Sequence, residues 1–261
     1  MMNRICLRIS LVALWTIIFR EVRRFLRIWP QTLLPPAITM LLYFVIFGRL
    51  MGRRIGDMEG FSYIEYIVPG LIMMSVITNA YNNVASSFFS TKFHRSVEEL
   101  LVAPVSAHVI LCGFVTGGVL RGLAVGLIVS LLSRLFVQLP LSHPGITLLV
   151  ILLTAVIFSL GGFINAVFAR NFDDISIVPT FILTPLTYLG GVFYSISLLP
   201  AFWQAISLGN PVLHMVNAFR YGLLGISDIQ IGVAVSFMLL ACLLLYGWSI
   251  YLLNTGKGLR Q

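Results

Sequence analysis

Charged side chains are scarce in this sequence, since Asp, Glu, Lys and Arg together make up only 10% of its 261 residues. A typical soluble domain carries about 25%. Hydrophobic residues account for 59%, and the mean hydropathy is +0.98. A soluble core cannot absorb that much apolar surface, so the composition excludes a soluble globular protein. It predicts an all-α, polytopic membrane protein, because helices satisfy their own backbone hydrogen bonds in lipid.

The sequence also lacks the residue sets that catalysis and metal binding need. Its three cysteines are isolated, with no C-x-x-C pair, so they indicate neither disulfides nor metal ligands. Its four histidines share no metal-binding spacing. The stretch "TGKG" is not a phosphate-binding loop, which would need a glycine in place of Tyr251 and a serine or threonine in place of Gly258. We therefore expect no enzymatic activity and no metal or other cofactor in this chain.

Long charge-poor stretches are what the chain has instead. A helix needs about 20 apolar residues to span a bilayer. Trimmed where charges or prolines interrupt them, the stretches predict six transmembrane helices at about 30–51, 64–90, 107–136, 146–169, 175–194 and 229–254. The third of these includes Arg121.

One apolar stretch, 195–225, is left over between the fifth and sixth spans. Prolines break it into two parts, and neither part is long enough as a helix to cross about 30 Å of hydrocarbon. It therefore predicts a re-entrant, extracytoplasmic hairpin of two short helices, with an aromatic residue at the interface and an arginine that reaches headgroups or a neighbouring carbonyl. The residues that define it are Pro200, Trp203, Asn210, Pro211 and Arg220.

Lys and Arg outside the predicted spans indicate the orientation of the chain. With both termini in the cytoplasm, the cytoplasmic side holds more of these residues than the opposite side, as the positive-inside rule requires. The net charge of +8 is explained in the same way, by contact with anionic membrane lipids. No basic run interleaved with aromatics indicates a nucleic acid partner.

Residues 5–29 predict a helix that lies in the plane of the membrane. Four arginines recur at positions i, i+3, i+4 and i+7, and aliphatic and aromatic side chains lie on the opposite face; the arginines are Arg20, Arg23, Arg24 and Arg27. A basic amphipathic helix of this kind binds at the membrane interface. The alternative is simple anchoring of positive residues on the cytoplasmic side.

Polar side chains line two of the predicted spans at helical spacing. They are Asn79, Asn82, Asn83 and Ser86 in the second span, and Thr180, Thr184, Thr187 and Tyr188 in the fifth. Arg121 lies near the middle of the third. Lipid cannot hydrogen-bond such groups, so they are candidates for the lining of a pathway. The alternative is hydrogen bonding between helices, which contributes about 0.6 kcal/mol per bond.

Residues 92–106 are the predicted cytoplasmic connection between the second and third spans. We expect Ser96 to cap a short helix whose first turn carries acids, where negative charge is favourable, and Pro104 to end it. Its distinguishing residues are Val97, Glu98, Glu99, Leu100, Leu101 and Pro104. A short amphipathic helix of this kind fits a partner's groove, although an ordinary connecting helix on the headgroups would carry the same pattern.

This connection resembles the cytoplasmic loop of ABC type-2 transporter permeases, in which Arg precedes a Glu-Leu-Leu core followed by a small residue, Pro and Val. Three other parts resemble the same family in the same order: "FREVRRFLRIWP" with "LLYFVIFGRLMG", "YIEYIVPGLIMMSVITNAYNNV", and "GGVFYSISLLPAFWQAISLGNPVLHMVNAFRYGLLG". Together they cover nearly the whole chain. The resemblance is closest to the YadH-like permeases of the bacterial inner membrane.

The resemblance implies that residues 1–261 form one ABC type-2 transmembrane domain, the permease subunit of an ATP-driven exporter. A second copy would complete the pathway as a homodimer, and separate cytoplasmic ATPase subunits would hold the ATP and Mg²⁺. Residues 92–106 would be the coupling helix that contacts the ATPase, with the N-terminal helix as a second contact. Two alternatives stay open: an ion- or proton-coupled secondary transporter, which would need intramembrane carboxylates or an internal repeat, and a membrane scaffold protein.

Overall fold

The computed structural model describes residues 2–258, and the side chains of these residues except those at 2–7, 49, 50, 53 and 101. Within this range the only sheet is a two-stranded antiparallel hairpin, so the predicted all-α fold class is confirmed.

The elements of the first part are α1 (Met2–Arg27), α2 (Trp29–Thr32), α3 (Leu34–Tyr43), the π-helical η1 (Phe44–Met51), α4 (Gly52–Ile55), β1 (Asp57–Met58), β2 (Phe61–Ser62), α5 (Tyr63–Phe93) and α6 (Ser96–Val102). Those of the second part are α7 (Ala107–Ser133), α8 (Pro144–Phe168), α9 (Phe172–Val178), the π-helical η2 (Pro179–Leu183), α10 (Thr184–Tyr188), the 3-10 turn η3 (Ile196–Leu198), α11 (Ala201–Leu208), α12 (Pro211–Leu224) and α13 (Ile231–Thr255).

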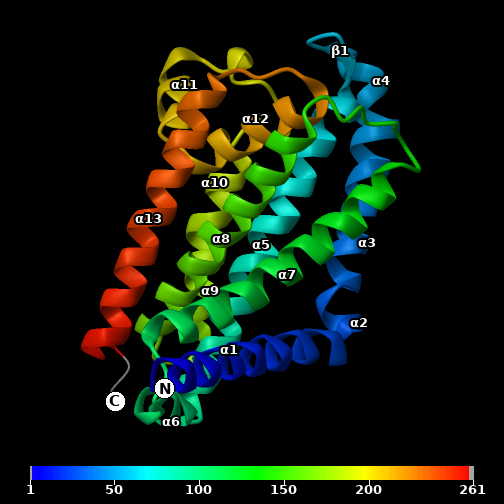
Figure 1. Cartoon of the computed structure of the whole chain (residues 1–261). Helices are drawn as coiled ribbons and strands as arrows, with labels where there is room; N and C mark the ends of the chain where they lie inside the picture. The colour runs from blue at the N-terminus through cyan, green and yellow to red at the C-terminus, as the bar shows by residue number, and fades with distance from the viewer. Residues whose placement is uncertain (1, 259–261) are drawn as a thin grey trace.

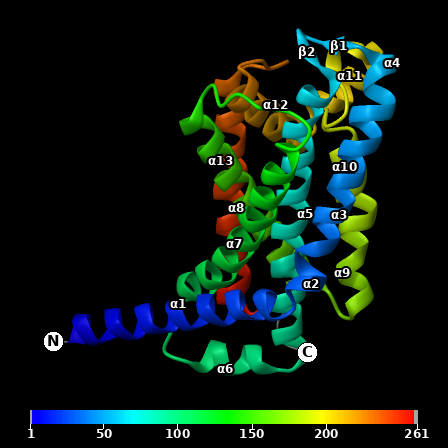
Figure 2. The ribbon, with the colours of Figure 1, turned by 90° about the vertical axis from the view of Figure 1, so that its right-hand side faces the viewer.

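The helices define two ends of the molecule. Helix α1 lies across one end, where α6 and the last turn of α13 are also found (Figures 1 and 2); we call this the basal end. The β1–β2 hairpin and α11 lie at the opposite end, which we call the hairpin end. The first half of α1 projects beyond the bundle in Figure 2, and its apolar side chains Leu11, Val12 and Trp15 are exposed. A helix that lies in the membrane plane presents an apolar face of this kind.

Five helices of the described chain are long and apolar enough to cross a membrane: Trp29–Gly48, Tyr63–Phe93, Ala107–Ser133, Pro144–Phe168 and Ile231–Thr255. They coincide with the first four predicted spans and the sixth. The predicted fifth span, 175–194, is instead helical over residues 172–188 in three successive pieces, α9, η2 and α10. Pro179 and Pro185 lie within this segment, and each proline removes one helical hydrogen bond, which accounts for the irregularity.

Helix α5 is the centre of the bundle. In its most apolar 18-residue segment, 78% of the residues are buried, whereas the corresponding share in α13 is 11%. Helix α5 is therefore enclosed by protein, and α13 faces outward. Helices α7 and α8 pack against α5, and glycines allow their close approach. A Cβ atom at Gly162 of α8 would meet the carbonyl oxygen of Tyr81, and one at Gly118 of α7 would lie 3.0 Å from the carbonyl oxygen of Ala80.

Two short helices occupy most of the stretch 195–225. Helix α11 has 8 residues and α12 has 14, which corresponds to about 12 and 21 Å, less than the hydrocarbon thickness of a bilayer. Pro200 precedes α11, and Pro211 is the first residue of α12. The Asn210 side chain accepts a hydrogen bond from the Val212 amide at 2.9 Å and donates one to the Leu186 carbonyl at 2.7 Å. The turn between the two helices is therefore tied to α10.

Candidate functional site

The polar stripe of α5 begins with the residues Asn79, Asn82 and Asn83, which we call the asparagine ladder. Residues four apart share a helix face, so Asn79 and Asn83 lie on one side, and Asn82 and Ser86 lie on the adjacent one. Asn79 and Asn83 are buried, and Asn82 and Ser86 are half-buried. The Asn79 amide donates to the Ser75 carbonyl at 3.0 Å, and the Ser86 hydroxyl donates to the Asn82 carbonyl at 2.7 Å. The stripe predicted from spacing thus faces protein.

Arg121 of α7 contacts this ladder. Its Nη2 atom lies 3.3 Å from the Asn79 side-chain oxygen. Beside this contact is a cavity of about 450 Å³, to which α5, α7 and the α9–η2 segment all contribute; its lining is Asn82, Ser86, Arg121, Ile175, Ser176, Pro179 and Thr180. The tertiary structure therefore brings Arg121 together with the beginnings of both polar stripes.

The rest of the second stripe lies elsewhere. The Thr184 and Thr187 hydroxyls donate within their own helix, to the carbonyls of Pro179 at 2.9 Å and of Thr184 at 2.8 Å. The Tyr188 ring stacks on Phe193 with 5.7 Å between ring centroids. None of the three lines the 450 Å³ cavity, so of the threonines predicted for the pathway only Thr180 is placed there.

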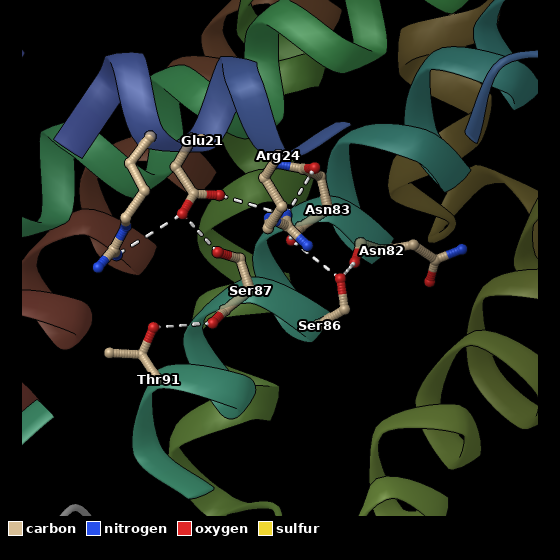
Figure 3. Close-up of polar contacts among 8 residues, drawn as sticks. Glu21, Arg24, Asn82, Asn83, Ser86, Ser87 and Thr91 are labelled. Atoms are coloured by element: carbon tan, nitrogen blue, oxygen red, sulfur yellow. Dashed lines mark hydrogen bonds and ion pairs between the residues drawn. The ribbon is translucent and has the colours of Figure 1, made fainter. Parts of the chain in front are cut away.

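A buried ion pair joins α1 to the ladder at Asn83, one turn from the Arg121 contact (Figure 3). The Glu21 side chain is only 1% exposed; its carboxylate lies 3.2 Å from Arg24 and 3.7 Å from Arg20. It also accepts a hydrogen bond from the Ser87 hydroxyl at 2.6 Å. Arg24 donates to the Asn83 side-chain oxygen at 2.9 Å and to the Asn83 carbonyl at 3.0 Å. Sequence reasoning missed Glu21, because a single acid among arginines in a basic helix carries no sign of burial.

The four arginines of α1 therefore do not act as one surface face. Arg24 is directed into the bundle, whereas Arg20, Arg23 and Arg27 are exposed. All four line a groove of about 1050 Å³ that runs between α1, the basal end of α5 and the residues before α6. His94 and Ser96 form its far wall. This groove is strongly basic, with Glu21 as the one acid in its lining.

Helix α6 differs from the prediction in how it begins. Its N-cap is Arg95 in the left-handed conformation (φ 60°), with no side-chain cap, and Ser96 is the first helical residue; the expected Ser96 cap is therefore wrong. Val97 is 2% exposed and anchors the helix, and Leu100 is half-buried. Glu98, Glu99, Val102 and Pro104 are exposed, whereas the Leu101 side chain lies outside the described residues. The exposed acids and Val102 form a protruding surface at the basal end.

Lys92 anchors the turn that leads into α6, a role that sequence reasoning missed. Its ammonium group donates to the carbonyls of Val167 and Ala169 at 2.6 and 2.8 Å, and the residue is 6% exposed. Helix α8 ends at Phe168, and cations are favourable at the free carbonyls of a helix C-terminus. The basal ends of α5 and α8 are therefore held together beside α6.

Arg220 of α12 lies inside the protein, 1% exposed. Its guanidinium donates to the carbonyls of Gly191 at 2.6 Å and Tyr66 at 3.3 Å, and to the Asn217 side chain at 3.2 Å. It also lies over the Tyr66 ring, 3.9 Å from the centroid. The sequence predicted that this arginine reaches either headgroups or a neighbouring carbonyl, and in the structure it binds neighbouring carbonyls. Trp203 of α11 is 44% exposed and remains available to the interface.

Two carboxylates meet at one hydroxyl at the hairpin end. The Ser195 hydroxyl lies 3.1 Å from Glu59 and 2.8 Å from Asp228. Desolvation and the neighbouring Asp228 charge raise the pKa of Glu59. Glu59 occupies the left-handed region (φ 51°) in the turn of the β1–β2 hairpin, where non-glycine residues are uncommon. The contact with Ser195 thus holds a strained turn against the segment that precedes α11.

Within residues 2–258 no cluster of three or more His, Cys, Asp or Glu side chains could hold a metal ion. The cavity at Arg121 offers a cation, amides and hydroxyls. These groups can bind and orient a polar ligand by hydrogen bonds and charge. A nucleophile next to a general base, which covalent catalysis needs, is not among the residues that line it.

Comparison with known proteins relates this chain to one protein family. The profile of the family described as "ABC-2 type transporter" matches residues 12–224. The chain is 59% identical, over 254 residues, to the inner membrane transport permease YadH of Escherichia coli (strain K12), covering 96% of this chain and 98% of that protein. It is 24% identical, over 198 residues, to nodulation protein J of Rhizobium meliloti (strain 1021), covering 74% of each chain.

Proposed function

We propose a transport mechanism from one premise: the chain belongs to the ABC-2 type transporter family and is the membrane subunit of an ABC transporter. It is a multi-pass permease of the inner membrane. This family membership decides against the two alternative functions, an ion- or proton-coupled secondary transporter and a membrane scaffold protein. We infer that the chain exports its substrate, that it works with a separate cytoplasmic ATPase that binds ATP and Mg²⁺, and that it performs no catalysis itself.

The cavity at Arg121 is the observation that supports a translocation site. It lies between α5, α7 and α9, at a depth where polar groups need protein or water around them. Ser176 and Thr180 on its rim are exposed in the single chain, so a second copy that faced this side would cover them. This supports a homodimer whose pathway runs between two such cavities.

The basal end is the proposed docking surface for the ATPase. Glu98, Glu99 and Val102 protrude there, and the groove lined by the α1 arginines lies beside them. Placing this end in the cytoplasm puts both termini there as well, in agreement with the distribution of Lys and Arg. The hairpin end is then extracytoplasmic, and α11 and α12 shape the exit.

Motion can reach the pathway from this surface by two routes. Closure of the ATPase would displace α6, which joins α5 through the two-residue turn His94–Arg95, anchored by Lys92. Displacement of α1 would act through Glu21 and Arg24 on Asn83. Both routes end on α5, so a rigid-body shift of α5 against α9 would open or close the cavity between them.

Co-purification with the ATPase tests this proposal. Reversing the exposed acids of α6, in the double variant E98K/E99K, should greatly reduce the amount of ATPase retained and the ATP hydrolysis measured in the complex. Asp57→Lys reverses an equally exposed acid at the hairpin end and serves as the matched control. Unchanged ATPase retention in E98K/E99K would show that α6 is not the contact. Hydrolysis by the permease alone would refute a separate ATPase.

A further inference from the structure

Arg121 is a cation without an anion. Among the described residues, ion pairs within 4.0 Å are formed only by Glu21, with Arg20 and Arg24. Arg121 has one neutral contact, the Asn79 side-chain oxygen at 3.3 Å, and its buried Nε atom has no hydrogen-bond partner. A charge inside a membrane protein is normally paired or marks a substrate pathway.

The described chain supplies Arg121 with no carboxylate partner within 4.0 Å. Its nine acids lie away from the cavity or are already engaged. Glu21 is buried in its own ion pairs, and Glu65 accepts hydrogen bonds from Ser62 at the start of α5. The others lie in the β1–β2 hairpin, in α6, in the first turn of α9 and after α12: Asp57, Glu59, Glu98, Glu99, Asp173, Asp174 and Asp228.

Asp173 and Asp174 are the carboxylates nearest to the cavity along the chain. Asp174 directly precedes Ile175 of the lining and accepts hydrogen bonds from the Arg170 and Asn171 amides at 2.8 and 3.3 Å. Asp173 lies one helical turn before Ser176 and is exposed at the beginning of α9. Neither forms an ion pair with Arg121 in this structure. The cavity lining therefore holds one full positive charge surrounded by neutral donors and acceptors.

We propose that the transported molecule carries a negatively charged group, such as a phosphate or carboxylate, and that Arg121 binds it. This inference rests on the proposed transport function and names the substrate class. The charged donors of an arginine bind an oxyanion strongly, and the Asn82 amide and the Ser176 and Thr180 hydroxyls complete the shell. A cavity of about 450 Å³ holds the anionic group with a small part of the molecule around it.

The position of Arg24 adds to this preference. Arg24 binds Asn83 and Arg121 binds Asn79, and these asparagines are one turn apart on α5, about 6 Å. Glu21 pairs with Arg24, whereas no carboxylate of the described chain lies within 4.0 Å of Arg121. The surroundings of the asparagine ladder are therefore positive overall and would repel a cationic substrate.

Binding to the purified permease, without ATPase, tests the inference. The probes are a dansyl-labelled decyl phosphate and the matching neutral dansyl-labelled decanol, titrated in a neutral detergent. Wild type should prefer the phosphate, and Arg121→Gln should reduce this preference tenfold or more, as expected for the loss of charge-assisted hydrogen bonds. Arg121→Lys should retain part of the preference, and Arg134→Gln, an exposed arginine at the end of α7, should retain all of it.

The inference is refuted if wild type binds both probes equally or if R121Q keeps the full preference. Retention of the ATPase by R121Q shows that the variant is folded, because the proposed docking surface lies at the basal end. It also separates the two proposals. If the ATPase is retained while the phosphate preference is absent from wild type, the substrate class is wrong and the transport function stands.

Discussion

Removing the guanidinium of Arg220 should release the α11–α12 segment from the bundle. Arg220→Met keeps an unbranched side chain of similar length but loses three hydrogen bonds, of 2.6, 3.2 and 3.3 Å, and the contact with the Tyr66 ring. It leaves the Gly191 carbonyl without its guanidinium donor. The variant therefore tests whether one buried cation holds the hairpin end together.

The expected loss follows from these contacts. Hydrogen bonds from a charged donor contribute about 1.5–3 kcal/mol each. Losing the cation also removes the cost of burying it, whereas each buried acceptor left unsatisfied costs about 1–3 kcal/mol. We expect a net destabilisation of about 3 kcal/mol, which for a chain of this size lowers Tm by about 6 °C or more. Arg220→Lys keeps the charge without the fork of donors and should fall between wild type and R220M.

Two measurements check this prediction. Tm is read from tryptophan fluorescence in detergent, with Arg134→Met as the exposed arginine control. Local opening is read by thiol labelling of Ser207→Cys, a position in α11 with 0% exposure, in a background without native cysteines. Leu208→Cys, 51% exposed, gives the reference rate. If R220M keeps the wild-type Tm and S207C stays protected, Arg220 does not anchor the hairpin.

Three further predictions follow from other contacts. Gly162→Ala places a methyl group against the α5 backbone and should lower Tm by several degrees. In the control Gly161→Ala, the new methyl group meets only ring atoms at 3.7 Å and beyond, so Tm should not change. Equal Tm values for the two variants would contradict the close packing. Glu21→Gln removes the only carboxylate that pairs with the α1 arginines in the described chain. The free energy of unfolding should fall by about 1–3 kcal/mol, a value discounted because the partner arginine is partly exposed. A cysteine pair across α1 and α5 should then cross-link more slowly, and an unchanged rate would argue against the ion pair. Burial and the adjacent carboxylate raise the pKa of Glu59 above 4.5, so its stabilisation is present at acid pH and is lost as pH rises through that raised value. Glu59→Gln should flatten this part of the dependence of Tm on pH. A curve for E59Q identical to wild type would exclude this role.

Much of the helical architecture could be predicted because hydrophobicity is a property of the chain itself. Charge-poor stretches located the long helices, and prolines located the breaks around α11 and α12. The fifth span was predicted as one helix, since composition does not show that Pro179 and Pro185 divide it into three pieces. The Ser96 cap was wrong for a related reason: Arg95 adopts a left-handed conformation and itself takes the N-cap position of α6, which the spacing of residues does not show.

The sequence by itself determined that this protein is a membrane protein and which polar residues lie within apolar helices. Only the tertiary structure decided their partners. Arg121 and its partner Asn79 are 42 positions apart in the sequence, Glu21 and Ser87 are 66 apart, and Arg220 and Tyr66 are 154 apart. Such contacts depend on how each helix is rotated and which helix lies beside it. Those are set by close packing at glycines such as Gly118 and Gly162, because small side chains decide which faces can approach.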